Sequence, residues 1–397
     1  MTDTGSRPQA GFWKRNAGRL AAMVSMAALA GCQVVPKPDR TPPPPAAAAP
    51  TPDVLTPLPS DAQRHRVALL VPMTGANAGV GRSISNATIM AQFDTRTEKV
   101  RITTYDTGAG VAPAVKKALA EGNRLILGPL TADEVRVAAP LARAAKVPML
   151  SFSNDVSVAG QGVYLMGYVP AQSIERVVGY ATGRGVTNFA ALVPKGLYGE
   201  RAGNAVLAAV RAKGGNVVAL ESFDRTPASM AAAVKKLGES SSYDALLIAD
   251  VARVAVQIAP LVRTGSGAKA RLLGTELWNT DETVRTSVPL RGAWYASVSD
   301  DLYRTFSTKY RTRYKAAPYR LASLGYDAVL LTVRIADTWK VGDAFPAARL
   351  TDKEGFGGLD GVFRFSGNGI VERALEVSEV EAGTLKVVDP APVEFPK

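Results

Sequence analysis

Two short polar loops carry the side chains of this sequence that are best suited to hold a small molecule. Gly128-Pro-Leu-Thr131 follows an apolar run at 125–127, and Ser151-Phe-Ser-Asn-Asp155 follows a second apolar run at 147–150. Hydroxyl, amide and carboxylate groups donate and accept hydrogen bonds, so these loops are equipped to recognise polar groups. In open parallel sheets, ligands bind beyond the carboxyl ends of the strands. We therefore expect a ligand site where the two loops meet.

Histidine and cysteine, which dominate catalytic and metal sites, each occur once in this chain, as His65 and Cys32. A single cysteine excludes an intramolecular disulfide. One histidine leaves no ligand set typical of zinc and no base for a His-based triad, and the sequence has no nucleophile elbow. A site of paired carboxylates stays open as the enzymatic alternative. We expect no catalytic residue, no metal site and no cofactor.

The two loops belong to a predicted β-α-β unit. Thr131 and Glu134 have the spacing of a capping box, which predicts that a helix starts there. Short buried strands joined by helices indicate an α/β fold with a parallel doubly wound sheet. Strands are predicted at 67–71, 100–105, 125–127 and 147–150, with helices at about 80–93, 111–121 and 132–145.

A second block of alternating elements begins after residue 170. Thr226-Pro227 predicts a helix cap followed by proline in the first turn. Strands are predicted at 189–193, 217–220, 245–249, 271–274 and 295–298, and helices at about 200–213, 227–238, 252–263, 300–315 and 319–340. A turn-rich β region at 357–369 and two last strands near 371–379 and 385–388 complete the pattern. The two blocks indicate two similar α/β units.

The length and composition fit an ordinary globular protein. The 397 residues, 47% hydrophobic and 21% charged, are enough for one large or two ordinary domains. The net charge is +12; Arg7, Lys14, Arg15 and Arg19 against Asp3 supply +3, which leaves +9 for the rest. A positive surface favours lipid headgroups, polyanions or an acidic protein, and simple solvation of the cations is the alternative. Nucleic acid is not an expected partner, because the sequence lacks the pattern of basic and aromatic residues typical of nucleic-acid-binding proteins.

The first 31 residues are typical of a targeting segment. A basic stretch precedes a short apolar stretch at 20–30, whose eleven residues are too few for a membrane-spanning helix, which needs about 20. Leu29-Ala-Gly-Cys32 resembles the lipobox of bacterial lipoproteins, which implies cleavage before Cys32 and lipidation of that residue. A free cysteine after an ordinary signal peptide is the alternative. Gln33, in place of the aspartate of inner-membrane retention signals, implies the outer membrane. The Pro- and Ala-rich stretch at 32–65 is expected to be an extended tether.

Several motifs together resemble type I periplasmic binding proteins of the leucine-binding kind, over roughly 66–388. The motifs are Val71-Pro-Met-Thr-Gly75, Gly128-Pro-Leu-Thr131, Val147-Pro-Met-Leu-Ser151, Tyr198-Gly-Glu200, Gly274-Thr-Glu276, Leu324-Gly-Tyr-Asp-Ala-Val329 and Phe356-Gly-Gly-Leu-Asp-Gly-Val-Phe-Arg-Phe365. The resemblance implies two Rossmann-like lobes, each a parallel sheet flanked by helices, joined by three crossings. Lobe one is expected at 66–169 plus 299–355, and lobe two at 170–298 plus 356–390.

The resemblance also implies ligand contacts. In amino-acid-binding members an aromatic residue and an acid of lobe two close over the ligand, and Tyr198 and Glu276 match those positions. In lobe one the usual hydroxyl falls on Ala132 and the usual threonine on Asp155. A carboxylate there repels a bound carboxylate by about 1 kcal/mol at about 4 Å in water, which disfavours branched-chain amino acids. The candidate ligand residues are Thr74, Thr131, Ser151, Ser153, Asn154, Tyr198 and Glu276.

Each candidate also has a structural interpretation. Thr131 caps a helix, and one residue can both cap and bind. Residues 151–155 form an ordinary turn cluster, Tyr198 opens a helix, Glu276 lies in a loop, and Thr74 precedes a glycine that a tight turn requires. The basic, aromatic run at 309–315 is either a solvated helix face or an interaction patch.

The anchor, the tether and the imperfect amino-acid pocket together resemble the penicillin-binding-protein activator lipoproteins. That resemblance implies a non-enzymatic regulator of peptidoglycan synthesis on the periplasmic face of the outer membrane, with a peptidoglycan synthase as partner. The sequence shows no helical-repeat domain before the α/β body, unlike the longer activators, so the partner stays open. The alternative is a receptor that delivers an amino acid or similar small polar solute to an ABC importer.

Overall fold

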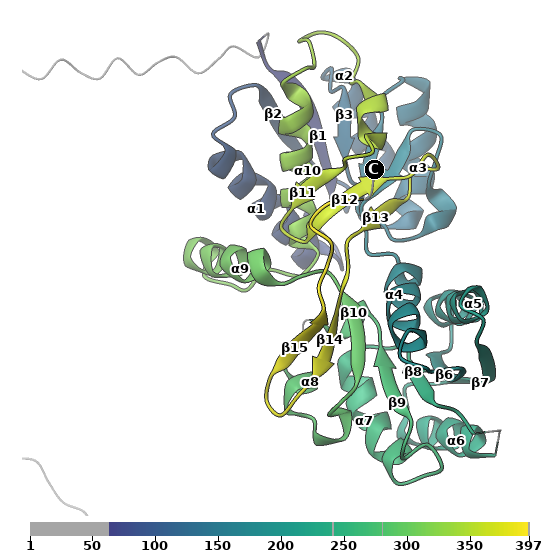
Figure 1. The fold of residues 1–397 in the computed structure, drawn as a ribbon. Helices are drawn as coiled ribbons and strands as arrows, with labels where there is room; N and C mark the ends of the chain where they lie inside the picture. Colours follow the sequence, from purple (N-terminus) through teal and green to yellow (C-terminus); the bar gives the residue numbers. More distant parts are fainter. Residues whose placement is uncertain (1–62, 240–241, 280, 396–397) are drawn as a thin grey trace, which may run out of the picture. The chain divides into compact units, whose positions relative to one another are not determined.

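The first block of the sequence forms a five-stranded parallel sheet. The computed structural model describes residues 63–239, 242–279 and 281–395 (Figure 1). The strand order is β2-β1-β3-β4-β5, and every neighbouring pair is parallel. The strands are β1 (His65–Val71), β2 (Val100–Asp106), β3 (Leu125–Leu127), β4 (Met149–Ser151) and β5 (Val163–Leu165). The predicted leader, Cys32 and most of the tether lie outside the described residues.

Central strand β1 explains why this sheet needs helices on both faces. Val67 and Leu69 enter one apolar core, while Ala68 and Leu70 enter another on the opposite face. A strand buried on both sides reads as a continuous apolar run, which is the pattern that predicted it. Helices α1 (Ala78–Thr95) and α10 (Ala322–Ala336) contribute to the first core, and α2 (Val111–Ala120) and α3 (Ala132–Ala144) to the second.

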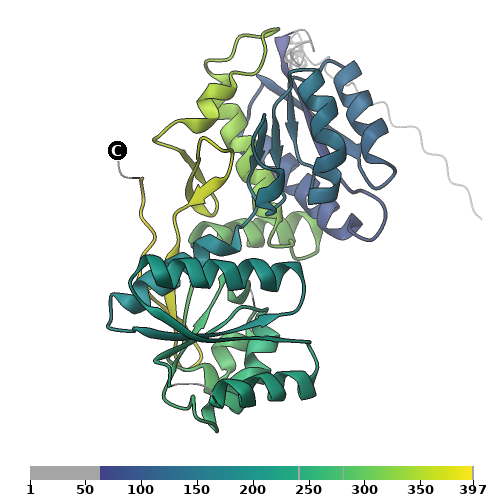
Figure 2. The ribbon, with the colours of Figure 1, turned by 90° about the vertical axis from the view of Figure 1, so that its right-hand side faces the viewer.

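The second block forms a seven-stranded sheet with the order β15-β14-β10-β9-β8-β6-β7. Its parallel part comprises β6 (Asn188–Pro194), β7 (Asn216–Phe223), β8 (Ala245–Ile248), β9 (Arg271–Gly274) and β10 (Trp294–Ser297). Strands β14 (Glu376–Val380) and β15 (Leu385–Asp389) extend it in antiparallel fashion. Figure 2 shows helices on both faces of this sheet. They are α4 (Pro170–Thr182) and α5 (Leu197–Ala212) on one core, and α6 (Pro227–Gly238) and α7 (Ala252–Arg263), with the short α8 (Thr283–Thr286), on the other.

The chain passes between the two sheets three times: between β5 and α4, between β10 and helix α9 (Asp301–Tyr314), and between strand β13 (Val371–Arg373) and β14. Helix α9 (Asp301–Tyr314) packs on α1 through Phe306 and Tyr310. The expected architecture of two α/β lobes with parallel sheets flanked by helices is therefore confirmed.

A small antiparallel sheet follows α10. It consists of β11 (Phe356–Gly358), β12 (Gly361–Phe365) and β13 (Val371–Arg373). Phe356, Phe363, Phe365 and Val371 pack into the core of the first sheet, against side chains of α10. The sequence analysis assigned 356–390 as one piece to lobe two, whereas 356–373 pack with the first sheet and only the later strands join the second. The exact lobe limits stay a prediction.

Candidate functional site

Thr131 caps helix α3 beyond the carboxyl end of β3. Its Oγ1 accepts a hydrogen bond from the Glu134 backbone N–H at 3.3 Å, and the Glu134 carboxylate accepts from the Thr131 backbone N–H at 2.8 Å. The predicted capping box is therefore present. The same carboxylate also accepts hydrogen bonds from the hydroxyls of Thr131, at 3.0 Å, and Thr107, at 2.6 Å. The polar groups of Thr131 thus bond within the protein itself.

Thr74, beyond the end of β1, is engaged in the same way. Its hydroxyl donates to Asp106 Oδ2 at 2.7 Å, and the backbone N–H groups of Met73 and Gly108 donate to Asp106 Oδ1 at 2.7 and 2.8 Å. Burial alone would raise the pKa of Asp106, but these hydrogen bonds to its ionised form lower it instead. Thr74 therefore fixes the loops after β1 and β2 relative to each other.

The loop after β4 is ordered by a chain of hydroxyl hydrogen bonds. Ser151 Oγ donates to the Pro129 carbonyl at 3.0 Å and accepts from the Ser153 backbone N–H at 3.1 Å. Ser153 Oγ in turn accepts from the backbone N–H of Asp155 at 3.1 Å. Ser151 and Ser153 are buried, whereas Asn154 is exposed. The loop therefore holds the carboxylate of Asp155 in a defined position.

Asp155 is a buried acid between two arginines. Its Oδ1 lies 2.7 Å from Nη2 of Arg201, in α5 beside the second sheet. Its Oδ2 lies 3.2 Å from Nη2 of Arg136, in α3 beside the first sheet. Ser157 donates to Oδ1 through its hydroxyl at 2.6 Å and its backbone N–H at 2.9 Å. Burial opposes ionisation, but the Arg201 and Ser157 hydrogen bonds outweigh it and lower the pKa of Asp155 to about 2. The carboxylate is therefore ionised and links the two halves of the fold.

The second sheet brings Tyr198 and Glu276 together at the carboxyl ends of its strands. Tyr198 opens α5 after β6, and its hydroxyl lies 3.3 Å from Thr275 Oγ1, at the end of β9. Burial and the neighbouring Glu276 carboxylate raise the pKa of Tyr198. Burial also raises the pKa of Glu276, whose Oε2 accepts a hydrogen bond from the hydroxyl of Ser173 in α4. A cavity of about 10 Å³, lined by Ser173 and Glu276 among others, has room for roughly one water.

Sequence reasoning missed the arginines at this edge. Arg225, after β7, makes three hydrogen bonds of 2.9–3.1 Å with the buried carboxylate of Asp250, after β8. Arg136 and Arg201 take the same role for Asp155. In a sequence, an arginine within a helix looks like an ordinary solvated residue. The available signal was the aspartate, since a carboxylate that becomes buried requires a cation nearby.

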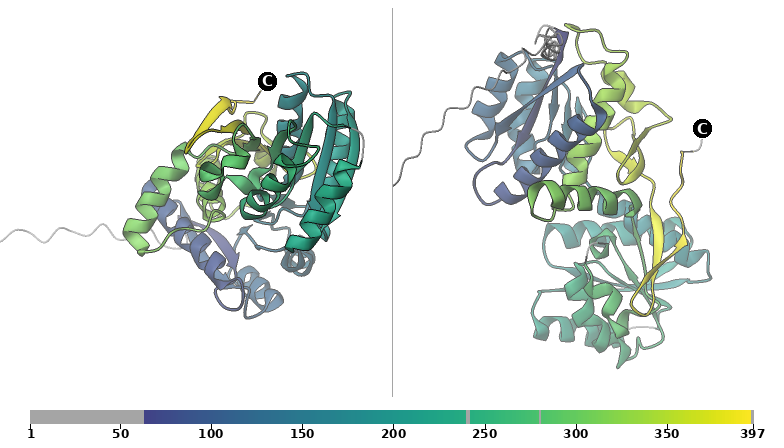
Figure 3. Two further views of the ribbon diagram at one scale, coloured as in Figure 1. Left: turned by 90° about the horizontal axis from the view of Figure 1, so that it is seen from below. Right: turned by 90° about the vertical axis from the view of Figure 1, so that its left-hand side faces the viewer.

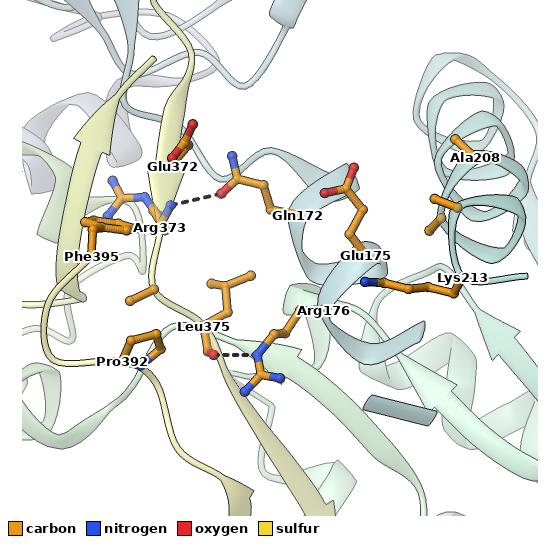
Figure 4. Close-up of a pocket in the computed structure, with 13 residues that line it drawn as sticks. Gln172, Glu175, Arg176, Ala208, Lys213, Glu372, Arg373, Leu375, Pro392 and Phe395 are labelled. Carbon is orange, nitrogen blue, oxygen red and sulfur yellow. Dashed lines mark hydrogen bonds between the residues drawn. The ribbon is translucent and has the colours of Figure 1, made fainter. Parts of the chain in front are cut away.

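A groove of about 610 Å³ lies away from these residues (Figure 4). Its walls come from α4, α5, the segment around β13 and the carboxyl-terminal residues Pro392 and Phe395. Two hydrogen bonds hold polar groups of this groove (Figure 4). Arg176 Nε donates to the Leu375 carbonyl at 2.9 Å, and Gln172 Oε1 accepts from the Arg373 backbone N–H at 3.1 Å. None of the predicted ligand residues lines this groove.

The described residues contain no cluster of metal ligands and no membrane-spanning helix. Within that part of the chain, no three His, Cys, Asp or Glu side chains gather as ligands of a metal ion. Among the described helices, none combines the length and apolar character needed to cross a bilayer.

Comparisons with known proteins connect this arrangement to a family. The chain is 24% identical over 177 residues to the uncharacterized protein RP748 of Rickettsia prowazekii (strain Madrid E), a match that covers 44% of this chain and 47% of that protein. The chain thus matches about half the length of this curated relative.

Two solved structures share the fold at low sequence identity. The leucine binding protein LivK from Thermotoga maritima is 18% identical, with a TM-score of 0.60, over 82% of this chain and 98% of that one. The C-domain of LpoA from Haemophilus influenzae, described as a regulator of PBP1A, is 18% identical, with a TM-score of 0.65, over 81% and 99%. The model of the family described as "Periplasmic binding protein" matches residues 65–384. The chain therefore belongs to the periplasmic binding protein family.

Proposed function

We propose that this chain is a non-enzymatic, lipid-anchored regulator that recognises a peptidoglycan synthase from the periplasmic face of the outer membrane. The observation that carries the proposal is the position of Asp155 between Arg136 and Arg201. By resemblance, this position supplies a threonine that holds the ligand carboxylate in amino-acid-binding members. In this chain Asp155 stands in place of the threonine, and the guanidinium groups of Arg136 and Arg201 neutralise its charge.

The other candidate ligand groups support the same interpretation. The hydroxyls of Thr74, Thr131 and Ser151 donate to acceptors of the chain itself, and Glu276 accepts a hydrogen bond from Ser173. A ligand would have to replace each of these bonds to gain its own, so the net gain in free energy per contact is small. A recognition role on the outer surface of the lobes needs no such exchange.

The predicted anchor and tether fit a regulator that must reach its partner. Lipidation of Cys32 would hold the chain on a membrane, and a Pro-rich tether of about thirty residues at roughly 3 Å each would let the folded body work at a distance. The LpoA C-domain, a regulator of PBP1A, has the same fold on nearly its full length. A peptidoglycan synthase is therefore the partner that we propose.

The second candidate function is solute delivery to an ABC importer. The observation in its favour is that Tyr198 and Glu276 lie close enough at the carboxyl edge of the second sheet for the acid to raise the pKa of the phenol. By resemblance, this pair closes over the ammonium group of an amino acid. A ligand without a carboxylate would avoid repulsion by Asp155.

Capture from detergent-solubilised envelope separates the two functions. The chain from Pro57 to Lys397, immobilised, is the bait, because these residues form one compact unit with its own apolar cores. We expect enrichment of a peptidoglycan synthase over a bait unfolded by heat. Enrichment of an importer permease without a synthase would favour solute delivery instead.

A further inference from the structure

The end of helix α1 and the adjoining side of α9 form an exposed face of mixed apolar and basic character. We propose that this face docks on anionic lipid headgroups at a membrane surface. We define the α1–α9 face by Ile89, Phe93, Arg96, Lys309 and Arg313. The proposal goes beyond the proposed function, because it requires neither the synthase nor a ligand.

The two helices are held side by side, so the face is rigid (Figure 1 and Figure 3). The Asn86 side-chain amide donates to the Tyr310 hydroxyl at 3.0 Å, and the Tyr314 hydroxyl donates to the Asn86 carbonyl at 3.0 Å. Beneath these bonds, Met90 packs with Phe306 and Tyr310 in a buried cluster. The face therefore binds without the cost of ordering a loop.

Two apolar side chains stand out from this face. Phe93 is 61% exposed and Ile89 is 38% exposed, and their spacing of four residues places them on one side of α1. Moving such side chains from water into the boundary between headgroups and acyl chains is favourable, because it buries apolar surface. Both lie on the outer side of a helix whose inner side is well packed, so they are available for contact with a membrane.

Cations lie beside the exposed Phe93. The Arg313 guanidinium lies 4.4 Å from the centroid of the Phe93 ring, and Arg96 is the C-cap residue of α1. Lys309 pairs with Asp94 at 3.5 Å, and Glu98 is a second exposed acid nearby. Helix α9 with its C-cap nevertheless carries five cations against one acid: Arg304, Lys309, Arg311, Arg313 and Lys315 against Asp301. The excess of positive charge complements anionic headgroups.

A groove of about 450 Å³ continues the α1–α9 face. Phe93 and Arg96 line it together with Arg64 and Arg101, and its eight lining residues include no acid. Phosphate-sized groups fit such a basic groove, and each lysine or arginine near an anionic bilayer strengthens attraction to it. The long side chains of these arginines also reach from an apolar contact into the headgroup layer.

The direction of the chain adds a further argument, which rests on the predicted anchor. Arg64 lies in this groove, immediately before β1, so the predicted tether joins the folded body at the groove that continues the α1–α9 face. This is the amino-terminal edge of the first sheet, whereas the candidate site lies at the carboxyl ends of the strands. Docking through the α1–α9 face would therefore leave the candidate site accessible to a partner.

Co-sedimentation with vesicles tests the proposal. The probe is the chain from Pro57 to Lys397, which carries neither the leader nor Cys32, with vesicles of equimolar phosphatidylglycerol and phosphatidylcholine or of phosphatidylcholine alone. We expect binding to the anionic vesicles and its loss at about 0.5 M salt, where charges are screened within a few ångströms. Reversal of one cation, as in Arg96→Glu or Arg313→Glu, should weaken binding by roughly fivefold or more.

A matched pair of changes on α5 serves as control. Leu207 is 42% exposed, and Arg211 is an exposed cation one turn later. Phe93→Ser with Arg313→Glu should abolish sedimentation, while Leu207→Ser with Arg211→Glu should leave it unchanged. Equal loss in both pairs, or no binding to anionic vesicles, would overturn the proposal. Binding to poly-glutamate without binding to vesicles would also overturn it, since the face would then belong to an acidic protein. None of these outcomes depends on synthase capture.

Discussion

The Asp155 carboxylate and the Arg201 guanidinium approach to 2.7 Å, although they come from opposite halves of the fold. Asp155 follows β4 of the first sheet, and Arg201 lies one turn into α5 beside the second sheet. By resemblance, Asp155 stands at the position of a threonine that holds the ligand carboxylate in amino-acid-binding members. The contact therefore joins the lobes without a ligand.

Replacing Asp155 by asparagine should destabilise the fold by about 1–3 kcal/mol, because it removes charge-assisted bonds to a buried acceptor. Asp133→Asn is the matched control, since Asp133 pairs with the same Arg136, at 2.7 Å, but its side chain is 95% exposed. The control should cost less than about 0.5 kcal/mol. Denaturant unfolding at neutral pH measures both. Equal losses of unfolding free energy in the two variants would mean that the buried Asp155 pair stabilises the fold no more than the exposed Asp133 pair does.

The same carboxylate predicts an acid-sensitive stability. The pKa of Asp155 is about 2 in the folded chain, below its unfolded value of roughly 3.9. A depressed pKa stabilises the fold above the unfolded value and loses that contribution as the pH falls toward the folded one. The difference between wild type and Asp155→Asn should therefore shrink, by on the order of 2 kcal/mol, between about pH 5 and pH 2. A constant difference across this range would contradict the assignment.

Replacing either of two buried aspartates near the crossings by asparagine should destabilise the fold to very different extents. Asp360 accepts from Tyr168 at 2.6 Å and pairs with Arg320 at 2.7 Å; burial opposes its ionisation, but Arg320 and Arg373 lower its pKa. Burial and the Asp360 charge raise the pKa of Asp327 to about 7. At about pH 6, Asp360→Asn should cost about 3–5 kcal/mol, because it leaves the buried Arg320 with only its 3.5 Å pair to Asp300.

Asp327→Asn is the control for that experiment. Asp327 is mostly protonated below its raised pKa, so a neutral amide resembles its side chain. Asp327 Oδ1 accepts from the Leu359 backbone N–H at 2.7 Å, and the amide oxygen of asparagine can keep this bond. The cost should stay below about 1 kcal/mol. Denaturant unfolding of both variants at one pH makes the comparison. A larger loss for Asp327→Asn than for Asp360→Asn would reverse the charge assignment.

Two helical glycines give a test of packing. A Cβ on Gly199 would lie 1.6 Å from the Pro194 carbonyl oxygen, a backbone atom that cannot move aside. A Cβ on Gly179 would meet only Lys213 Cε, at 3.5 Å. Gly199→Ala should therefore destabilise by about 3 kcal/mol or more, whereas Gly179→Ala should stabilise by roughly 0.5–1 kcal/mol through its helix propensity. Thermal unfolding reports both signs, and a tolerated Gly199→Ala would place α5 farther from β6.

Local signals were sufficient to predict most of the fold. The capping box of Thr131 and the Thr226-Pro227 start are encoded within a few residues, and both helices begin where these signals predict. Helix α4 was not predicted, because its N-cap, Val169, makes no side-chain capping bond. Its Pro170 is the first helical residue, where the sequence analysis instead ended the first unit. Strand β5 was not predicted either, because it lies just before the point where the first unit was expected to end.

The candidate site was harder to predict than the fold, because its partners meet only in three dimensions. Sequence reasoning noted that Asp155 is unsuited to bind a carboxylate. It had no means to find Arg201, which is brought near by the crossing of the chain into the second sheet. Likewise, Phe363 and Phe365 were predicted to lie in the turn-rich β region of lobe two, and only packing assigns them to the first core.

Isothermal titration of amino acids into the wild-type chain tests the central claim most directly. The account predicts no saturable heat with leucine or other neutral amino acids, and no change in the unfolding temperature, because the Asp155 carboxylate would repel the carboxylate of the ligand. Saturable binding of an amino acid would contradict it, as would stabilisation approaching about 2.7 kcal/mol at a ligand concentration of 100 times the Kd.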